Sequence, residues 1–353
     1  MDGYLIGGIQ QIGAGVPDLV RAFRWYRRNL GMDVPVFEDE GEAALMLPYT
    51  GGKPQSRKAV LAVNLQGGGG LEIWQYTERS PRPPEFEVQP GDLGIYCARI
   101  KARDPRQAHA VLAVGGAEVL GPVLPDPSGE PSFFLRDPFG LIFQVVRGDD
   151  WFSRGRQTTG GVAGCLLGVS ELDRCLELYR GILGYDRVIY DRQGVFADLA
   201  CLPGGGRPLR RVLLAHSAER QGAFSALLGA TRLELVQSLE RASRKIFADR
   251  YWGDLGFIHL CFEVNGMEGL KRRCGRAGFP FTVDSAEAFV MGEASGRFAY
   301  VEDPDGTLIE FVETYRLAVL KKWGWFLDLR RRSPEKPLPR WMLLALRLNR
   351  VHD

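Results

Sequence analysis

Four short stretches of the sequence place a polar side chain inside an apolar run. The stretches are GGIQQIG, LEIWQ, GFIHLCFEV and TLIEFV, and the polar residues at issue are Gln11, Glu72, His259 and Glu310. Imidazole, carboxylate and amide groups supply the nitrogen and oxygen atoms that bind divalent metal ions. Each residue also has a structural explanation: a hydrogen-bonded core histidine, an outward-facing strand glutamate or a surface glutamine. The elements that carry these residues must decide between the two interpretations.

Those elements are repeated along the chain. VPDLVRAFRWYRRNLG (residues 16–31) matches VSELDRCLELYRGILG (residues 169–184) without a gap, and 169 minus 16 gives an offset of 153 residues. Each copy has apolar residues at helical spacing and ends at a glycine. This pattern predicts an amphipathic helix that is closed by a left-handed cap.

Three further pairs extend the repeat. LEIWQ matches LELVQ, the tetrapeptide GDLG occurs twice, and RDPFGLIFQVV matches EDPDGTLIEFV. After the later GDLG the chain carries His259, where we align the earlier copy at Ile95. Within each half, a strand, a helix and three short β-rich runs follow one another twice. The sequence therefore predicts four βαβββ modules, at about Gly8–Tyr76, Asp92–Arg147, Gly161–Ser238 and Gly256–Thr314.

Length and composition predict a soluble protein of two repeated domains. With 353 residues, 45% hydrophobic and 25% charged, the chain has enough apolar material for two cores. We expect domains at residues 1–150 and 161–314, joined by the polar segment 148–161. The net charge of +2 gives no electrostatic case for a nucleic-acid partner. The N-terminus lacks a signal-peptide pattern and no run is long enough to span a membrane, so we expect a cytoplasmic location.

The C-terminal segment, residues 315–353, has a different composition. It holds ten Lys or Arg residues and three acids. KKWGWFLDL and RWMLLALRL read as amphipathic helices on either side of the proline-rich SPEKPLP. We expect a basic helical tail that packs on the body of the chain or covers a homodimer interface, with a membrane-surface or partner contact as the alternative.

The repeated helix and the D-P-x-G-x-x-x-E hairpin resemble the vicinal oxygen chelate superfamily. This superfamily includes glyoxalase I, extradiol dioxygenases, cyclitol epimerases and antibiotic-binding proteins. The resemblance covers all of the chain except the tail and implies an α+β fold. In it, two βαβββ modules curl into one open, mixed β-barrel flanked by helices, so that four modules form two barrels. The two halves of the chain then become glyoxalase-like domains.

In that superfamily each module can offer a metal ligand from its first strand and another from its last. The equivalent positions here are Gln11 and Glu72, Ile95 and Gln144, Gly164 and Glu234, and His259 and Glu310. Pairing modules in chain order gives two incomplete sets. Pairing module one with module four brings Gln11, Glu72, His259 and Glu310 together, a set similar to that of eukaryotic-type glyoxalase I. We favour this pairing because it accounts for Gln11 as well as His259.

The resemblance further implies one divalent metal ion (zinc, nickel, manganese, cobalt or iron) and a small-molecule substrate. We expect an isomerase, as an epimerase of a hydroxy-ketone, or a glyoxalase-type lyase, which moves a proton next to a carbonyl through an enediolate. Glu310 is the expected principal base and Glu72 a second base or acid, with Trp74 and Tyr76 as walls of the substrate pocket. The alternatives are a resistance-type protein that binds a small molecule without chemistry and an Fe(II) ring-cleaving dioxygenase. Gly164 disfavours the dioxygenase, since we expect a histidine at that position.

Overall fold

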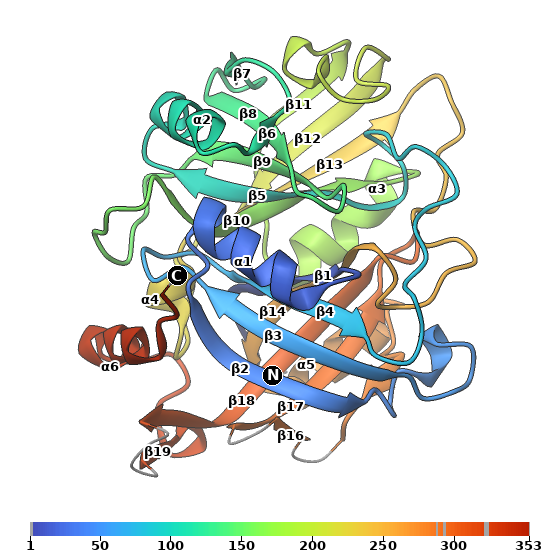
Figure 1. Ribbon diagram of the computed structural model, residues 1–353. Helices are drawn as coiled ribbons and strands as arrows, with labels where there is room; N and C mark the ends of the chain where they lie inside the picture. The colour runs from blue at the N-terminus through green and yellow to red at the C-terminus, as the bar shows by residue number, and fades with distance from the viewer. Residues whose placement is uncertain (1–2, 287–288, 292–293, 321–324, 353) are drawn as a thin grey trace.

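The computed structural model describes residues 3–286, 289–291, 294–320 and 325–352. These residues form two curled, mixed sheets, which occupy the lower and upper parts of Figure 1. The first sheet contains β1 (Leu5–Gly15), β2 (Val34–Glu42), β3 (Ser56–Val63), β4 (Gly70–Tyr76), β14 (Gly256–Asn265), β15 (Val283–Asp284), β16 (Phe289–Met291), β17 (Ala294–Glu302), β18 (Leu308–Leu320) and β19 (Trp325–Asp328). The second contains β5 (Gly94–Ala102), β6 (Glu118–Val119), β7 (Leu124–Pro125), β8 (Pro131–Arg136), β9 (Ile142–Arg147), β10 (Thr159–Gly168), β11 (Arg187–Gly194), β12 (Leu209–Ala215) and β13 (Arg232–Ser238).

The sheets combine modules from different halves of the chain. In the first sheet β1 pairs with β14 in antiparallel fashion, from Leu5 opposite Asn265 to Gly15 opposite Gly256. In the second sheet β10 pairs with β5. Modules one and four therefore share one sheet, and modules two and three share the other. The predicted α+β fold of tandem modules in two curled sheets is confirmed, whereas neither residues 1–150 nor residues 161–314 form a sheet of their own.

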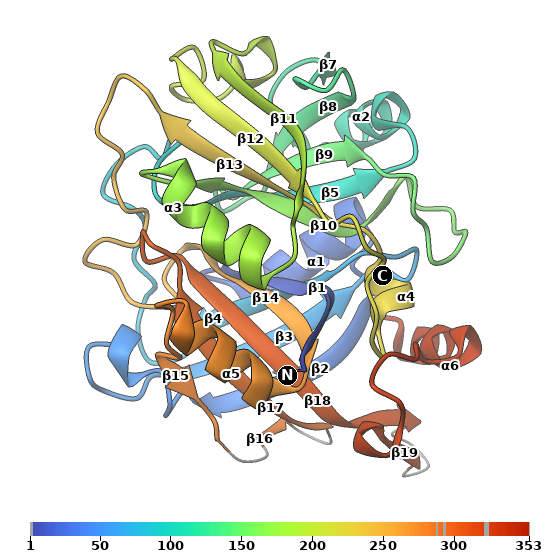
Figure 2. The same ribbon diagram turned by 180° about the vertical axis from the view of Figure 1, so that it is seen from behind.

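Helices flank the two sheets. They are α1 (Leu19–Leu30), α2 (Pro105–Val114), α3 (Leu172–Leu176), α4 (Ser225–Leu228), α5 (Met267–Arg276) and α6 (Arg340–Ala345). Helix α1 lies on the face toward the viewer in Figure 1, and α3 and α5 lie on the face seen in Figure 2. The predicted helix at 16–31 is α1, which begins after the cap Asp18 and ends at Gly31 in the left-handed region, φ 65°. Its second copy is shorter, because α3 continues as a π-helical turn over Glu177–Ile182.

A tyrosine–aspartate hydrogen bond occurs at the same place in both halves. The Tyr26 hydroxyl of α1 donates to Asp137 over 2.7 Å, and the Tyr179 hydroxyl donates to Asp303 over 2.9 Å. Each aspartate belongs to the D-P-x-G turn of the next module, which lies in the other sheet. Buried donors and acceptors of this kind fix the two sheets relative to each other. The same ties explain why the helix and the turn recur together in the sequence.

The tail begins as a strand, which corrects the prediction of a helix over KKWGWFLDL. Strand β18 extends to Leu320 and pairs with β19, whose register joins Arg316 to Asp328. A long strand edge offers this segment backbone partners that a solitary helix would lack. Lys321–Gly324 lie outside the described residues.

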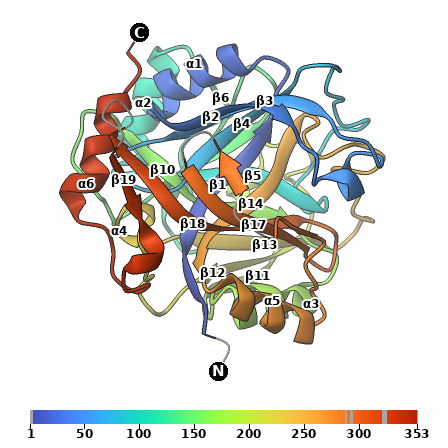
Figure 3. The ribbon, with the colours of Figure 1, turned by 90° about the horizontal axis from the view of Figure 1, so that it is seen from below.

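The second predicted helix of the tail is present as α6, followed by a 3₁₀ turn over Leu346–Asn349. Leu343 is fully buried in an apolar cluster with Val34 and Val63, so this part of the tail packs on the first sheet. Figure 3 shows α6 and β19 together on one flank, beside α4. None of the described helices is long and apolar enough to cross a membrane.

Candidate metal centre

Four adjacent strands of the first sheet carry the four predicted ligands. In the order β18, β14, β1 and β4 they present Glu310, His259, Gln11 and Glu72. The strand register sets Gly13 opposite both Glu72 and His259. A β-carbon at Gly13 would lie 2.6 Å from Cε1 of His259. This glycine therefore leaves the space in which the imidazole lies beside β1.

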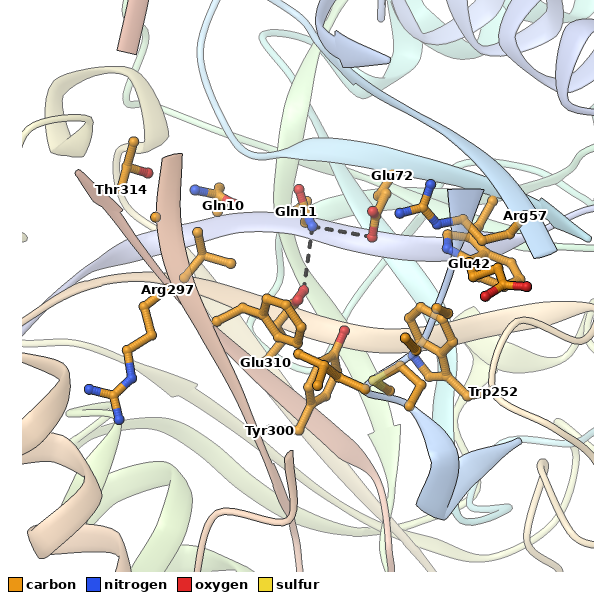
Figure 4. A pocket seen from close by; sticks show the side chains of 18 of the residues that line it. Gln10, Gln11, Glu42, Arg57, Glu72, Trp252, Arg297, Tyr300, Glu310 and Thr314 are labelled. Atoms are coloured by element: carbon orange, nitrogen blue, oxygen red, sulfur yellow. Dashed lines mark hydrogen bonds between the residues drawn. The ribbon is translucent and has the colours of Figure 1, made fainter. Parts of the chain in front are cut away.

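The side chains of these four residues converge on one point. Nε2 of His259 lies 3.1 Å from Oε2 of Glu72 and 3.2 Å from Oε2 of Glu310. Nε2 of Gln11 donates to the same two oxygens, over 3.3 Å and 3.5 Å (Figure 4). The residues come from both ends of the chain, and the sheet brings them within contact of one another. All four sequence-predicted ligand positions are therefore adjacent in the fold.

Unpartnered atoms show that this group fits a metal ion. Oε1 of Gln11 and both ring nitrogens of His259 are buried and have no hydrogen-bond partner. Ligand atoms at about 2.1 Å from an ion stand about 3.0–3.4 Å from one another, which is the spacing of these donors. Rotation of the Gln11 amide exchanges its N–H and its oxygen, so the side chain can present an acceptor to a cation. Two carboxylates, an imidazole and an amide oxygen suit a borderline or hard divalent ion.

Burial and mutual charge shift the pKa values of His259 and Glu310 upward. Burial lowers the pKa of His259, but the Glu310 and Glu72 carboxylates raise it by more. Burial raises the pKa of Glu310, and the neighbouring His259 and Glu72 act in opposite directions on it. The metal-free group therefore holds its protons more tightly than separate side chains would. A bound cation would have to displace them.

A cavity of about 180 Å³ opens beside the four residues and is lined by Gln11, Glu72 and Glu310. Of the two predicted walls, Trp74 lines this cavity, and Tyr76 does not belong to its described lining. The Tyr76 hydroxyl instead donates to the backbone carbonyl of Trp252.

Three cavity-lining aromatic residues were missed by the sequence reasoning: Trp252, Phe298 and Tyr300. The indole of Trp252 stacks on the His259 ring, with centroids 6.1 Å apart and an interplanar angle of 17°. Tyr300 meets the same ring edge-on, at 5.7 Å and 76°. The available signals were the position of Trp252 directly before GDLG and the position of Tyr300 two residues before the repeated hairpin begins at Glu302. Neither signal distinguishes a pocket wall from a core aromatic residue.

The equivalent positions of the second sheet do not form a metal site. Its ladder pairs Arg99 with Gln144, as the first sheet pairs Cys261 with Glu310. The residue equivalent to His259 is therefore Cys97, two positions before Arg99, and the alignment with Ile95 was wrong by two residues. Burial raises the pKa of the Cys97 thiol to about 12, so it stays protonated at neutral pH.

The remaining equivalents are also engaged elsewhere. Gln144 donates to the Ser132 hydroxyl over 3.2 Å. Gly164 has φ +139°, and a β-carbon there would lie 1.7 Å from the carbonyl oxygen of Arg232. Glu234 accepts from Nε of Arg211 over 2.6 Å and from the Tyr190 hydroxyl over 2.7 Å.

A second group of potential ligands, Cys175, Asp303 and Asp305, lies under α3. Its carboxylates are already satisfied. Asp305 accepts from the backbone N–H and the hydroxyl of Ser170, and Asp303 accepts from Tyr179 and from the N–H groups of its own turn. This group therefore fixes the turn of module four against the helix of module three.

Comparison with known proteins matches the first part of the chain to a family model. Residues 8–145 match the family model of the Glyoxalase/Bleomycin resistance protein/Dioxygenase superfamily. Residues 8–145 therefore resemble a domain of this superfamily. The resemblance inferred from the repeated helix and hairpin is thereby confirmed, and members of the superfamily are often metal-dependent enzymes. No curated protein matches the chain in sequence.

Solved structures share the fold over most of the chain. Glyoxalase I from Zea mays is 13% identical with a TM-score of 0.56, and the match covers 99% of this chain and 98% of that one. A putative dioxygenase from Bacillus subtilis is 14% identical with a TM-score of 0.55, covering 88% of this chain and 86% of that one. At these identities the likeness extends to the fold alone. The reaction has to be argued from the site.

Proposed function

We propose that the protein is a metal-dependent enzyme that moves a proton on the carbon next to a carbonyl of a small hydroxy-ketone, as an isomerase, epimerase or glyoxalase-type lyase. The supporting observation is the convergence of Oε2 of Glu72 and Oε2 of Glu310 on Nε2 of His259, at 3.1 Å and 3.2 Å, beside a cavity. Two carboxylates with one imidazole combine metal-binding groups with proton-transfer groups. A single site of this composition can do both.

Gln11, Glu72, His259 and Glu310 are the groups that would hold one divalent ion. Such an ion would acidify the C–H next to the carbonyl and stabilise the enediolate. Glu310 is the proposed principal base, because its carboxylate is buried, lines the cavity and has a raised pKa. Glu72 lines the same cavity and is the proposed second base or acid. His259 and Gln11 orient the two carboxylates.

The site favours this function over ring cleavage by iron. Non-haem Fe(II) oxygenases use two histidines and one carboxylate, whereas the four converging residues include one histidine. Of the alternatives predicted from the sequence, the non-catalytic binding protein is the one that the experiment below separates. It predicts that a hydroxy-ketone binds without exchange of its C–H proton.

Glu310→Gln tests the role of the proposed base. We expect it to lower the rate of deuterium incorporation next to the carbonyl of a hydroxy-ketone by about 10²–10⁴-fold, the range associated with general-base catalysis. Exchange is followed by proton NMR in D₂O with zinc- or manganese-loaded protein, and the metal content of each sample is measured. Glu42→Gln is the matched control, because Glu42 lines the cavity but is exposed. Full exchange activity in Glu310→Gln would remove the role of Glu310.

A further inference from the structure

Two hydrogen-bond donors in the cavity wall have no acceptor. Nη1 of Arg57 and Nε1 of Trp252 are buried and make no hydrogen bond, and both residues belong to the cavity lining. A buried N–H group without a partner is unfavourable, and an oxygen atom of a bound molecule would remove that cost. Figure 4 shows Arg57 and Trp252 on the same side of the group formed by Gln11, Glu72 and Glu310. The cavity thus has donors at a distance from its proposed reaction centre.

The positive charges of the cavity wall are already neutralised. Arg57 forms an ion pair with Asp39, at 2.5 Å between Nη2 and Oδ2. Arg297, on the other side of the cavity in Figure 4, is paired with Asp284 at 2.7 Å and with Glu268 at 2.5 Å.

The cavity lining also contains three glutamates, Glu42, Glu72 and Glu310. Glu42 adds an acidic side chain near Arg57, and Glu72 and Glu310 would be balanced by a divalent ion. The described lining residues therefore hold no surplus positive charge for a phosphate or a carboxylate. Arg57 can donate its free N–H to an oxygen, but its positive charge is already balanced by Asp39 and attracts a further anion only weakly.

Aromatic side chains form part of the cavity wall. Trp74 and Trp252 meet edge to face, with centroids 4.6 Å apart and an interplanar angle of 71°. Such a surface packs well against the C–H face of a ring or chain that carries hydroxyl groups on its edges. Apolar walls with a few fixed polar groups are the usual means by which a pocket sets orientation and specificity.

We propose that the substrate is an uncharged polyhydroxy ketone, whose distal hydroxyl or carbonyl oxygen accepts from Arg57 and Trp252. This proposal rests on the proposed function, and it makes the cavity selective against phosphorylated or carboxylate-bearing hydroxy-ketones. Arg57 is then the residue that fixes specificity, and Asp39 is the residue that keeps Arg57 from attracting anions. The four-residue group would meet the ketone end of the same molecule.

Xylulose and its terminal phosphate ester form a matched pair of probes, because they differ only in the charge of the distal group. Calorimetric titration of manganese-loaded protein should give xylulose the higher affinity, by about tenfold or more, since a buried unpaired anion is costly. Tighter binding of the phosphate ester, or no binding of xylulose, would overturn the proposal. Deuterium exchange on the same samples is read separately. Selective binding of xylulose without exchange would leave the specificity inference standing and contradict the proposed function.

Two variants test separately the hydrogen bond from Arg57 and the neutralisation of its charge by Asp39. Arg57→Met should weaken xylulose binding about tenfold, the loss expected for one buried hydrogen bond, while metal content stays unchanged. Asp39→Asn should strengthen binding of the phosphate ester about tenfold and change xylulose binding little, because it frees the charge of Arg57. Asp191→Asn is the matched control: it removes the carboxylate that pairs with Arg210 over 2.7 Å at the surface of the other sheet. If Asp39→Asn left the ratio of the two affinities, for xylulose and for its phosphate ester, unchanged, Arg57 would not face the ligand.

Discussion

The two barrels differ in the group that lies beside an equivalent glutamate. Glu72 and Glu234 occupy equivalent positions, each on the last strand of its module. Glu72 lies 3.1 Å from an imidazole nitrogen that has no hydrogen-bond partner. Glu234 lies 2.6 Å from Nε of Arg211. One barrel leaves its carboxylate available to an exchangeable cation, and the other supplies a cation from its own chain.

The strand registers show which neighbouring side chains differ between the two barrels. Ala59 faces Trp74 in the first barrel, and at the equivalent positions Arg211 faces Val236 in the second. A small residue beside a large one keeps the total volume similar, so either arrangement packs. The fully buried Arg211 also donates to Asp198 over 2.8 Å. In the second barrel Arg211 supplies an internal cation to Glu234. Cys97, Gly164 and Gln144 occupy the other three ligand positions there.

The pKa values of Glu234 and Glu310 shift in opposite directions. Burial raises the pKa of Glu234, but Arg211 and Arg99 lower it further, and the net shift is downward. In the first barrel burial dominates, and the pKa of Glu310 is raised. Glu234 is therefore a permanent anion with structural partners. Glu310 can exchange a proton, which is what the proposed reaction requires.

The largest effects are expected when the same substitution is made at the equivalent carboxylates of the two barrels. Glu72→Gln should lower the exchange rate about 10²–10⁴-fold and leave the free energy of unfolding nearly unchanged. Glu234→Gln should cost about 3–5 kcal/mol of stability, because it leaves buried arginines uncompensated. Its exchange rate per folded, metal-loaded molecule should stay close to that of the parent. Urea unfolding and deuterium exchange measure the two effects, and loss of exchange in both variants would refute the division of roles.

Metal binding provides the second test. Saturating zinc or manganese should bind as one ion per chain and stabilise the protein by about 2.7 kcal/mol at a free concentration of 100 times Kd. His259→Ala should abolish most of this stabilisation, and Cys97→Ala, its counterpart in the other barrel, should preserve it. Thermal unfolding with and without metal, combined with elemental analysis, reports both quantities. A stoichiometry of two ions would contradict the closed second barrel.

The smallest expected effect concerns a buried lysine of the second barrel. Burial lowers the pKa of Lys101 to about 8, against the opposing influence of Asp150. Its folded pKa is below its unfolded value of about 10.4, so the unfolded chain binds the proton more tightly and stability rises between about pH 8 and pH 10. Lys101→Met removes this pH-dependent contribution to the free energy of unfolding. The stability of the variant relative to the parent should therefore fall as pH rises through that window. Denaturant unfolding at pH 7 and pH 10 measures the difference, and an unchanged difference would show that Lys101 is charged in the fold.

Repetition made most of the architecture predictable. A duplicated helix and hairpin indicate duplicated modules, and the adjacency of Gln11, Glu72, His259 and Glu310 follows once modules one and four are paired. The alignment of Ile95 with His259 was a slip of two positions, because the two GDLG copies, aligned without a gap, place Cys97 six residues after Gly91 and His259 six residues after Gly253. The ladder of the structure, which pairs Arg99 with Gln144, gives the same equivalence.

Other features depend on distant contacts that no local pattern reports. KKWGWFLDL has the composition of an amphipathic helix, but a free strand edge at β18 made its C-terminal part a strand. The charge balance of Arg57 depends on Asp39, which is eighteen residues earlier in the chain and on another strand. Both cases show tertiary partners overriding local propensity.

The pairing of β1 with β14 has a consequence for how the chain is made. Modules two and three follow each other directly, so their barrel can close while synthesis is still under way, whereas β1 must wait for a partner about 250 residues downstream (Leu5 opposite Asn265). Until then one edge of β1 is open to wrong partners. The metal centre is accordingly the last part of the molecule to assemble, and a nascent or truncated polypeptide that lacks the fourth module cannot hold the ion.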